Sequence, residues 1–215
     1  MAIDPAKLSL YLITDPHLCA NIGLEQTVEA AIKGGVTMVQ LRDKHASTED
    51  RVALACRLKP ICAVHGVALV INDDAEAVQI SDVDGLHIGQ GDMCAELARQ
   101  TIGVDKIVGL SVETVKAAKK VSEELVDYVG ISPVFATPTK HDHKQPFGFD
   151  GLARICAASS VYTVAVGGLK LTDCQHVLAT GANGMAVVSA ICGQKDPYGA
   201  SMALAKSLAS YERQK

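Results

Sequence analysis

The sequence contains no tryptophan and only eight other aromatic residues, three Phe and five Tyr, among its 215 residues. Its interior must therefore be built from aliphatic side chains, and hydrophobic residues make up 48% of the chain, too many for a disordered protein. Short aliphatic runs without aromatic anchors are typical of parallel β-sheets that are covered on both faces.

Several other features are missing. The seven cysteines are scattered and form no CxxC pair, which excludes zinc-ribbon and thioredoxin-type motifs and fits a reducing compartment. No apolar run approaches the roughly 18 residues that span a bilayer, and the first residues include an early acid and no signal-like apolar stretch. The net charge of −4 gives no excess of basic residues. We therefore expect a cytoplasmic protein with neither a membrane nor a nucleic acid as partner.

Short runs rich in β-branched residues alternate with amphipathic or Ala-rich segments along the whole chain. The predicted strands are Leu8–Asp15, Val36–Asp43, Ala68–Asp73, Gly85–Gln90, Lys106–Val112, Asp127–Phe135, Tyr162–Gly168 and Met185–Ala190. The predicted helices are Thr27–Lys33, Glu49–His65, Asp74–Ile80, Glu96–Thr101, Glu113–Glu124, Phe149–Ala158, Thr172–Thr180 and Tyr198–Arg213. Thr48 and Asp150 are predicted to cap helix N-termini. Helices are predicted to end at Gly34–Gly35, Gly66, Gly103 and Gly181.

Alternation of this kind predicts parallel strand pairing, because each helical crossover returns the chain to the same edge of the sheet. The fold class is therefore α/β. Eight β/α units favour a closed (β/α)8 TIM barrel that occupies residues 1–215 as a single domain. An open doubly wound sheet is the alternative, but no GxGxxG motif opens the first helix.

Polar side chains gather where the predicted strands end, which is the catalytic face of such barrels. Gln40, Arg42 and Lys44 are spaced two apart, so they share one face of their strand. Arg and Lys at such a place suit phosphate oxygens. The alternative is that the two cations only pair with Asp43 or Asp73 at the rim.

Two carboxylates, Asp73 and Asp92, follow successive strands and should converge. Carboxylates with open positions suit Mg²⁺, which binds through one or two of them together with substrate phosphates. The alternative is that each caps the following helix. Asp74 is a candidate for that role, which would leave Asp73 for the metal.

The last two strands end in Gly167–Gly168 and in Val188–Ser189, at the place where barrels commonly cradle a phosphate with backbone N–H groups. The polar segment 137–146 could close over anionic substrates or be a solvated surface loop. His141 and His143 are expected at the surface, and His87 is expected to have a packing and orienting role rather than to transfer protons. The sequence shows no Ser–His–Asp set and no zinc signature, so its cations, carboxylates and phosphate cradles suit the departure of pyrophosphate best.

Six sequence blocks carry a family resemblance. They are GVTMVQLRDK at 35–44, VIND at 70–73, GLHIGQGD at 85–92, GLS at 109–111, DYVGISPVFATPTK at 127–140 and VAVGG at 164–168. In this order the blocks resemble the thiamin phosphate synthase family over nearly the whole chain, from Leu10 to Ile191.

The resemblance implies an Mg²⁺-dependent transferase. Its substrates would be 4-amino-5-hydroxymethyl-2-methylpyrimidine pyrophosphate and 4-methyl-5-(2-phosphoethyl)thiazole, and its products thiamin phosphate and pyrophosphate. It assigns Gln40, Arg42, Lys44 and Asn72 to the pyrimidine pyrophosphate, Ser111 to the pyrimidine, Lys140 to the pyrophosphate and Asp73 and Asp92 to Mg²⁺. It assigns Thr137, Thr139, Gly168, Val188 and Ser189 to the thiazole phosphate. Arg42, Lys44 and Lys140 would be the catalytic cations.

The chain departs from the common family pattern at a few positions. Val112 and Glu113 follow Ser111, Ser132 stands where glycine is usual, and Leu169 replaces isoleucine. Two alternatives stay open. One is a related thiazole tautomerase, which would not need the carboxylates and cations together, and the other is a non-catalytic barrel that binds thiazole phosphate or thiamin phosphate. A homo-oligomer is possible.

Overall fold

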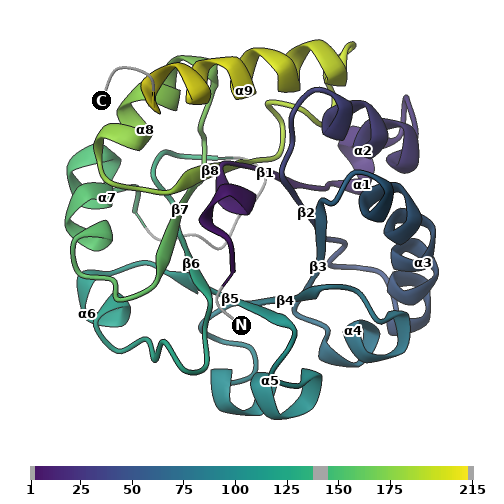
Figure 1. Ribbon diagram of the computed structural model, residues 1–215, viewed down its shortest axis with the longest axis horizontal. Helices are drawn as coiled ribbons and strands as arrows, with labels where there is room; N and C mark the ends of the chain where they lie inside the picture. The colour runs from purple at the N-terminus through teal and green to yellow at the C-terminus, as the bar shows by residue number, and fades with distance from the viewer. Residues whose placement is uncertain (1–2, 138–144, 213–215) are drawn as a thin grey trace.

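The computed structural model describes residues 3–137 and 145–212, and its eight strands form a closed parallel barrel in the order β1 to β8 (Figure 1). Each strand pairs with its sequence neighbours, and β8 closes the ring on β1. The strands are β1 Leu10–Ile13, β2 Met38–Leu41, β3 Ala68–Asn72, β4 Gly85–Ile88, β5 Ile107–Val112, β6 Tyr128–Ile131, β7 Tyr162–Val166 and β8 Gly184–Val187. The predicted (β/α)8 barrel is confirmed, and the open sheet is excluded.

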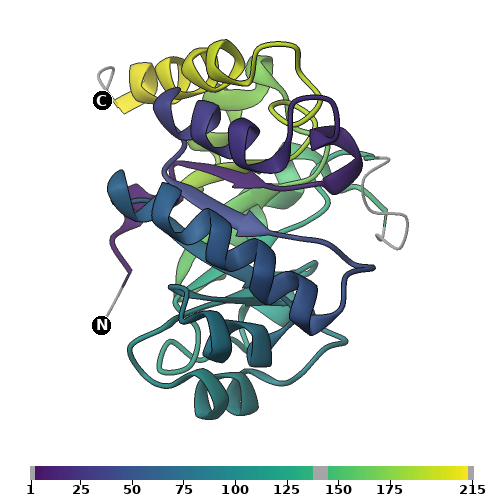
Figure 2. The same cartoon turned by 90° about the vertical axis from the view of Figure 1, so that its right-hand side faces the viewer.

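Helices return outside the barrel and cover the strands, as the side view in Figure 2 shows. The α-helices are α1 Pro16–Cys19, α2 Leu24–Lys33, α3 Thr48–Val64, α4 Ala75–Ser81, α5 Ala95–Ile102, α6 Val115–Ala118, α7 Gly148–Cys156, α8 Cys174–Ala179 and α9 Pro197–Glu212. Two 3₁₀ turns, η1 Pro5–Leu8 and η2 Leu171–Asp173, precede β1 and α8. No helix in the described ranges has the length and apolar character to cross a membrane.

The apolar core has two layers because the strands are buried on both faces. The larger layer lies between strands and helices and consists mainly of Val, Leu, Ile and Ala. The smaller one fills the barrel interior and includes Tyr11, Met38 and Tyr128. Leu8 of η1 belongs to the interior layer, so η1 closes the barrel at the amino ends of the strands. The carboxyl ends of the strands lie at the opposite end of the barrel, which η1 does not cover, so a ligand site can form there.

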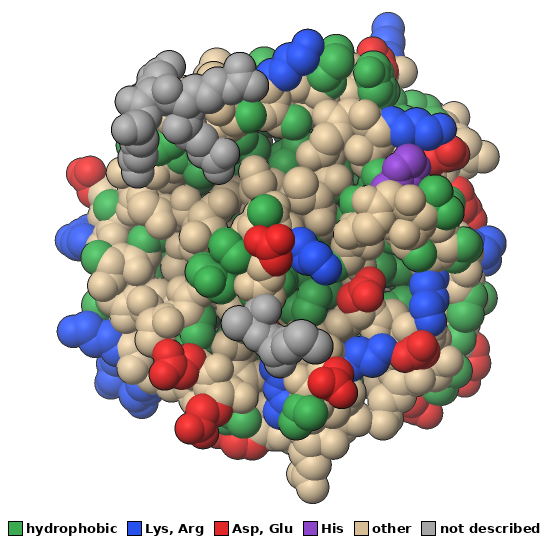
Figure 3. All heavy atoms as spheres, in the orientation of Figure 1, with side chains coloured by type: hydrophobic (Ala, Val, Ile, Leu, Met, Phe, Trp, Pro, Cys, Tyr) green, Lys and Arg blue, Asp and Glu red, His purple; other side chains and the backbone are tan. Residues whose placement is uncertain are grey.

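The face seen in Figure 3 includes η1 and carries Lys, Arg, Asp and Glu side chains interspersed around the barrel rim. The charge on this face is therefore mixed in sign. At the C-cap of α4, the exposed carboxylate of Asp82 accepts hydrogen bonds from the ammonium groups of Lys59 at 3.1 Å and of Lys106.

Three local predictions are wrong. The N-cap of α3 is Ser47, whose side chain accepts from the N–H of Asp50, and Thr48 is already the first helical residue. Asp150 lies inside the first turn of α7 and makes no capping bond. The helix predicted for Glu113–Glu124 is one turn only, because Thr114 caps α6 and the chain leaves the helix after Ala118. The predicted helix ends at Gly34, Gly66, Gly103 and Gly181 are confirmed, each glycine lying at or just beyond a helix terminus.

Candidate active site

A cavity of about 360 Å³ lies at the carboxyl ends of the strands, and all eight strands contribute to its lining. Every predicted site residue in the described ranges lines it: Gln40, Arg42, Lys44, Asn72, Asp73, Asp92, Ser111, Thr137, Gly168, Val188 and Ser189. Thr139, Lys140, His141 and His143 lie in 138–144, outside the described residues. The barrel thus brings together residues that are up to 149 positions apart, since Gln40 and Ser189 share one cavity.

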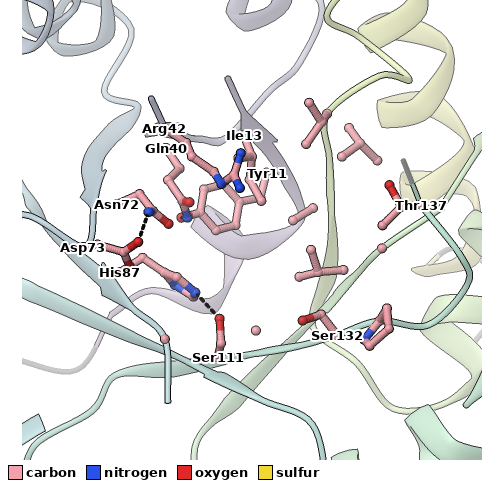
Figure 4. A pocket seen from close by; sticks show the side chains of 18 of the residues that line it. Tyr11, Ile13, Gln40, Arg42, Asn72, Asp73, His87, Ser111, Ser132 and Thr137 are labelled. Carbon is pink, nitrogen blue, oxygen red and sulfur yellow. Dashed lines mark hydrogen bonds between the residues drawn. The ribbon is translucent and has the colours of Figure 1, made fainter. Parts of the chain in front are cut away.

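One wall of the cavity carries most of the polar groups. In Figure 4 Gln40, Arg42, Asn72 and Asp73 lie on this wall, while Thr137 lies across the cavity. Gln40, Arg42 and Lys44 follow one another at two-residue intervals along β2 and the segment after it, from the barrel interior to the cavity rim. Gln40 is 2% exposed, Arg42 is half-buried and Lys44 is exposed.

The segment after β2 is fixed by backbone contacts. The N–H of Arg42 donates to Thr14 Oγ1 at 3.0 Å. The carboxylate of Asp43 accepts from the N–H groups of His45 and Ala46 at 3.0 and 3.2 Å. Within the described ranges Arg42 forms no ion pair with Asp43 or Asp73, so its guanidinium is available to a ligand in the cavity.

The two candidate metal ligands come from consecutive β/α loops. Asp73 follows β3 with a left-handed φ of 63°, and its N–H donates to the carbonyl of His87 at 2.9 Å. Its carboxylate accepts from the amide of Asn72. Asp92 follows β4, and its Oδ2 accepts from the N–H of Gly89 at 2.8 Å. Asp73 is half-buried and Asp92 is exposed at the cavity rim.

The electrostatics of this pair fit a divalent cation. Burial, together with the adjacent carboxylate of Asp92, raises the pKa of Asp73 to about 6, against the opposing effects of Asn72 and Lys44. A cation between two such carboxylates would relieve both causes, and Mg²⁺ takes oxygen ligands of this kind. Within the described part of the chain, no cluster of three or more His, Cys, Asp or Glu side chains is arranged to hold a metal ion. Two protein carboxylates would therefore leave positions for water and substrate oxygens.

Asp74 points away from the cavity. Its side chain caps α4 by accepting from the N–H of Ala77 at 2.9 Å. It also accepts from Thr48 Oγ1 and Arg51 Nη1, both at 2.9 Å. The prediction that Asp74 caps the helix is confirmed. Asp73, for which capping was the alternative, is not the N-cap of α4.

The opposite wall contains the predicted phosphate cradle. Gly167 and Gly168 follow β7 with left-handed φ values of 105° and 66°. A Cβ at Gly168 would lie 2.6 Å from the carbonyl oxygen of Ala136, so only glycine lets these two loops approach. The N–H groups of Gly168 and Ser189 form no hydrogen bond with any other residue in the described part of the chain. They are donors available to an anion.

Several lining residues were missed from the sequence, among them Tyr11, Glu113, Pro133 and Val166. The residues next to Tyr11 and Val166 in their strands are apolar too. The sequence pattern therefore does not show which side chains point into the barrel and which point toward the helices. Glu113 lines the cavity, and the departure from the family pattern at this position therefore lies at the site itself.

His87 is buried at 8% exposure, and both of its ring nitrogens are hydrogen-bonded. Nδ1 lies 2.9 Å from the hydroxyl of Tyr128, and Nε2 lies 3.0 Å from Oγ of Ser111. The expected packing and orienting role fits these contacts.

Comparisons with known proteins agree with the sequence blocks. The model of the family described as thiamine monophosphate synthase matches residues 10–191. The chain belongs to this family. The thiamine-phosphate synthase of Psychrobacter sp. (strain PRwf-1) is 50% identical over 193 residues, which are 88% of this chain and 90% of the relative. That of Albidiferax ferrireducens is 43% identical over 197 residues, covering 92% and 90%.

A solved structure is similar over almost its full length. It is the thiamine phosphate pyrophosphorylase of Pyrococcus furiosus, with a TM-score of 0.87, 30% identity and coverage of 96% of this chain and 98% of that one. The predicted family, the TIM-barrel fold and the assignment to an enzyme are therefore confirmed.

Proposed function

We propose that the protein joins 4-amino-5-hydroxymethyl-2-methylpyrimidine pyrophosphate to 4-methyl-5-(2-phosphoethyl)thiazole, giving thiamin phosphate and pyrophosphate. The observation that carries the proposal is that two separate groups of residues suited to anions line one cavity. Arg42, Lys44 and the carboxylate pair lie toward β2–β4, and Gly168 and Ser189 follow β7 and β8. A pyrophosphate and a phosphate could thus be held on opposite walls, with the reacting carbons and nitrogen between them.

The residues fall into three roles. Gln40, Asn72 and Ser111 would hold the pyrimidine, and Arg42 and Lys44 its pyrophosphate, joined by Lys140 from the segment outside the described residues. The thiazole phosphate would be bound by Thr137, Gly168, Val188 and Ser189, together with Thr139.

The chemistry needs no protein nucleophile. The bond between the pyrimidine methylene and the pyrophosphate oxygen breaks, and the oxygen keeps the electron pair. The amino group of the pyrimidine donates electron density to the methylene, and the thiazole nitrogen then forms the new C–N bond with its lone pair. The guanidinium of Arg42 and the ammonium of Lys44 stabilise the leaving group most as its negative charge develops, which is what lowers the barrier.

Mg²⁺ is the proposed cofactor, held by Asp73 and Asp92. When bound, it would neutralise charge on the pyrophosphate oxygens. Asn72 keeps the Asp73 carboxylate oriented, and the Gly89 N–H does the same for Asp92.

The test is thiamin phosphate formation by the purified protein, with Mg²⁺ and with EDTA. We expect product only with Mg²⁺. Asp92→Asn should lower turnover by roughly a hundredfold or more while the barrel stays folded. Asp105→Asn, at an exposed position before β5, is the matched control and should keep normal turnover. Normal activity of Asp92→Asn would contradict the metal assignment. Folded protein that binds the thiazole phosphate but forms no product would support the tautomerase or the non-catalytic binding protein instead.

A further inference from the structure

Four hydrogen bonds in series cross the barrel interior beneath the cavity. Gln40 Nε2 donates to the hydroxyl of Tyr11 at 2.7 Å, and that hydroxyl lies 2.9 Å from the hydroxyl of Tyr128. Tyr128 lies 2.9 Å from His87 Nδ1, and His87 Nε2 lies 3.0 Å from Ser111 Oγ. The chain joins Gln40 on β2 to Ser111 on β5, and both of these residues line the cavity (Figure 4).

A glycine provides the space for the contact between Tyr128 and His87 in the middle of this series of hydrogen bonds. Gly109 on β5 is paired in register with His87 on one side and with Tyr128 on the other. A Cβ there would lie 2.3 Å from Cζ of Tyr128 and 2.5 Å from Nδ1 of His87. The contact between the phenol and the imidazole therefore depends on a glycine at this one position, and no larger residue fits without separating them.

The number of protons fixes the direction of the chain. Burial raises the pKa of Tyr11 and of Tyr128 well above the ordinary value, so each phenol keeps its single proton at neutral pH. Tyr11 accepts from Gln40 and therefore donates to Tyr128, which in turn donates to His87 Nδ1. A neutral imidazole that accepts at Nδ1 carries its proton at Nε2 and donates it to Ser111 Oγ.

We propose that Tyr11, Tyr128 and His87 are positioning residues that fix the hydrogen-bond polarity of the cavity. They leave Gln40 Oε1 as an acceptor on the β2 side and the Ser111 hydroxyl as a donor on the β5 side. A ligand ring with an N–H donor toward Gln40 and an acceptor nitrogen toward Ser111 matches this polarity, and a 4-aminopyrimidine has both groups. This assignment of the substrate ring rests on the proposed function.

The first test reads the tautomer directly, without activity. In ¹⁵N-histidine-labelled protein, long-range ¹H–¹⁵N spectra report which ring nitrogen carries the proton, and the His87 signals are assigned by their loss in His87→Asn. We expect a single neutral Nε2–H tautomer for His87 and an exchange-averaged mixture in Tyr128→Phe. A proton on Nδ1 of His87, alone or on both nitrogens, would overturn the proposal.

The second test uses selectivity. Tyr11→Phe removes only the hydroxyl, and Tyr162→Phe on β7, outside the hydrogen-bond chain, is the matched control. Tyr11→Phe should raise KM for the pyrimidine pyrophosphate about threefold to tenfold, as expected for one neutral hydrogen bond, and leave KM for the thiazole phosphate unchanged. It should also reduce the preference for the 4-amino ring over a 4-oxo analogue, which has the reversed polarity, by a similar factor. Equal effects of both variants, or an unchanged preference, would contradict the proposal.

The two tests separate the possible failures. A wild-type protein that forms no thiamin phosphate but shows the Nε2–H tautomer would refute the proposed function and leave the polarity of the cavity standing. An active protein in which His87 carries its proton on Nδ1 would support the proposed function and refute the proposed polarity of the cavity.

Discussion

The carboxylate of Asp74 lies 2.9 Å from Nη1 of Arg51, and the two side chains are only 8% and 18% exposed. Asp74 also caps α4, directly after the residue that faces the cavity. Asp74→Ala removes the cap and takes away the only carboxylate partner that this largely buried guanidinium has in the described part of the chain, although the guanidinium keeps its hydrogen bonds to the carbonyl of Asp43. We therefore expect the free energy of unfolding to fall by about 3 kcal/mol. Urea titration of the purified variant measures this.

Lys33→Ala is the control for a broken ion pair. Lys33 and Glu29 form an exposed pair at 2.6 Å on α2, and solvent screens such pairs strongly. The urea midpoint of this variant should stay close to that of the wild type. An equal loss in both variants would show that burial of the Arg51–Asp74 pair contributes nothing.

Two glycines with the same φ allow the effect of backbone strain to be distinguished from the effect of a steric clash. Gly66 and Gly168 both have a φ of 66°, but a Cβ at Gly66 meets nothing within 4 Å, while one at Gly168 meets the carbonyl of Ala136. Gly66→Ala should cost about 1 kcal/mol of stability through its left-handed φ and leave the kinetics unchanged. Gly168→Ala should cost more and raise KM for the thiazole phosphate roughly tenfold, because the loop must move. Unchanged KM in Gly168→Ala would argue against a phosphate cradle here.

The pH dependence of stability should include a contribution from Asp82. Hydrogen bonds from Lys106 and Lys59, and the charges of both, lower its pKa to about 2. A carboxyl whose pKa is lower in the folded state stabilises the fold above its unfolded pKa of about 3.9, and this contribution is lost as the pH falls toward 2. Asp82→Asn should therefore be less stable than the wild type at pH 5, and most of the difference should be lost by pH 2. It should also shrink in 1 M salt. A difference as large at pH 2 as at pH 5 would point to a cause other than charge.

The sequence predicted the order and number of the strands because strand and helix patterns alternate without interruption. It predicted their ends less well. The strand expected over Asp127–Phe135 is only Tyr128–Ile131, since the buried loop residue Val134 continues the apolar run. The one-turn helix α1 was not predicted, although Asp15 caps it and Pro16 begins it, because four residues give no periodicity.

The candidate site was predictable where polar side chains follow apolar strands. Arg42 and Asp73 stand out in this way. The interior pair Tyr11 and Tyr128 does not, because both strand faces are apolar and only the register shows which residues point inward. Their contact joins residues 117 positions apart, a separation that local patterns do not report.

Simultaneous measurement of both products is the most direct test of the proposed reaction. The purified protein is given the pyrimidine pyrophosphate and the thiazole phosphate with Mg²⁺, and thiamin phosphate and released pyrophosphate are quantified in the same samples. The two should appear at equal rates, with little pyrophosphate released when the thiazole phosphate is omitted. Pyrophosphate release without matching thiamin phosphate, or the absence of both products, would contradict the proposed condensation.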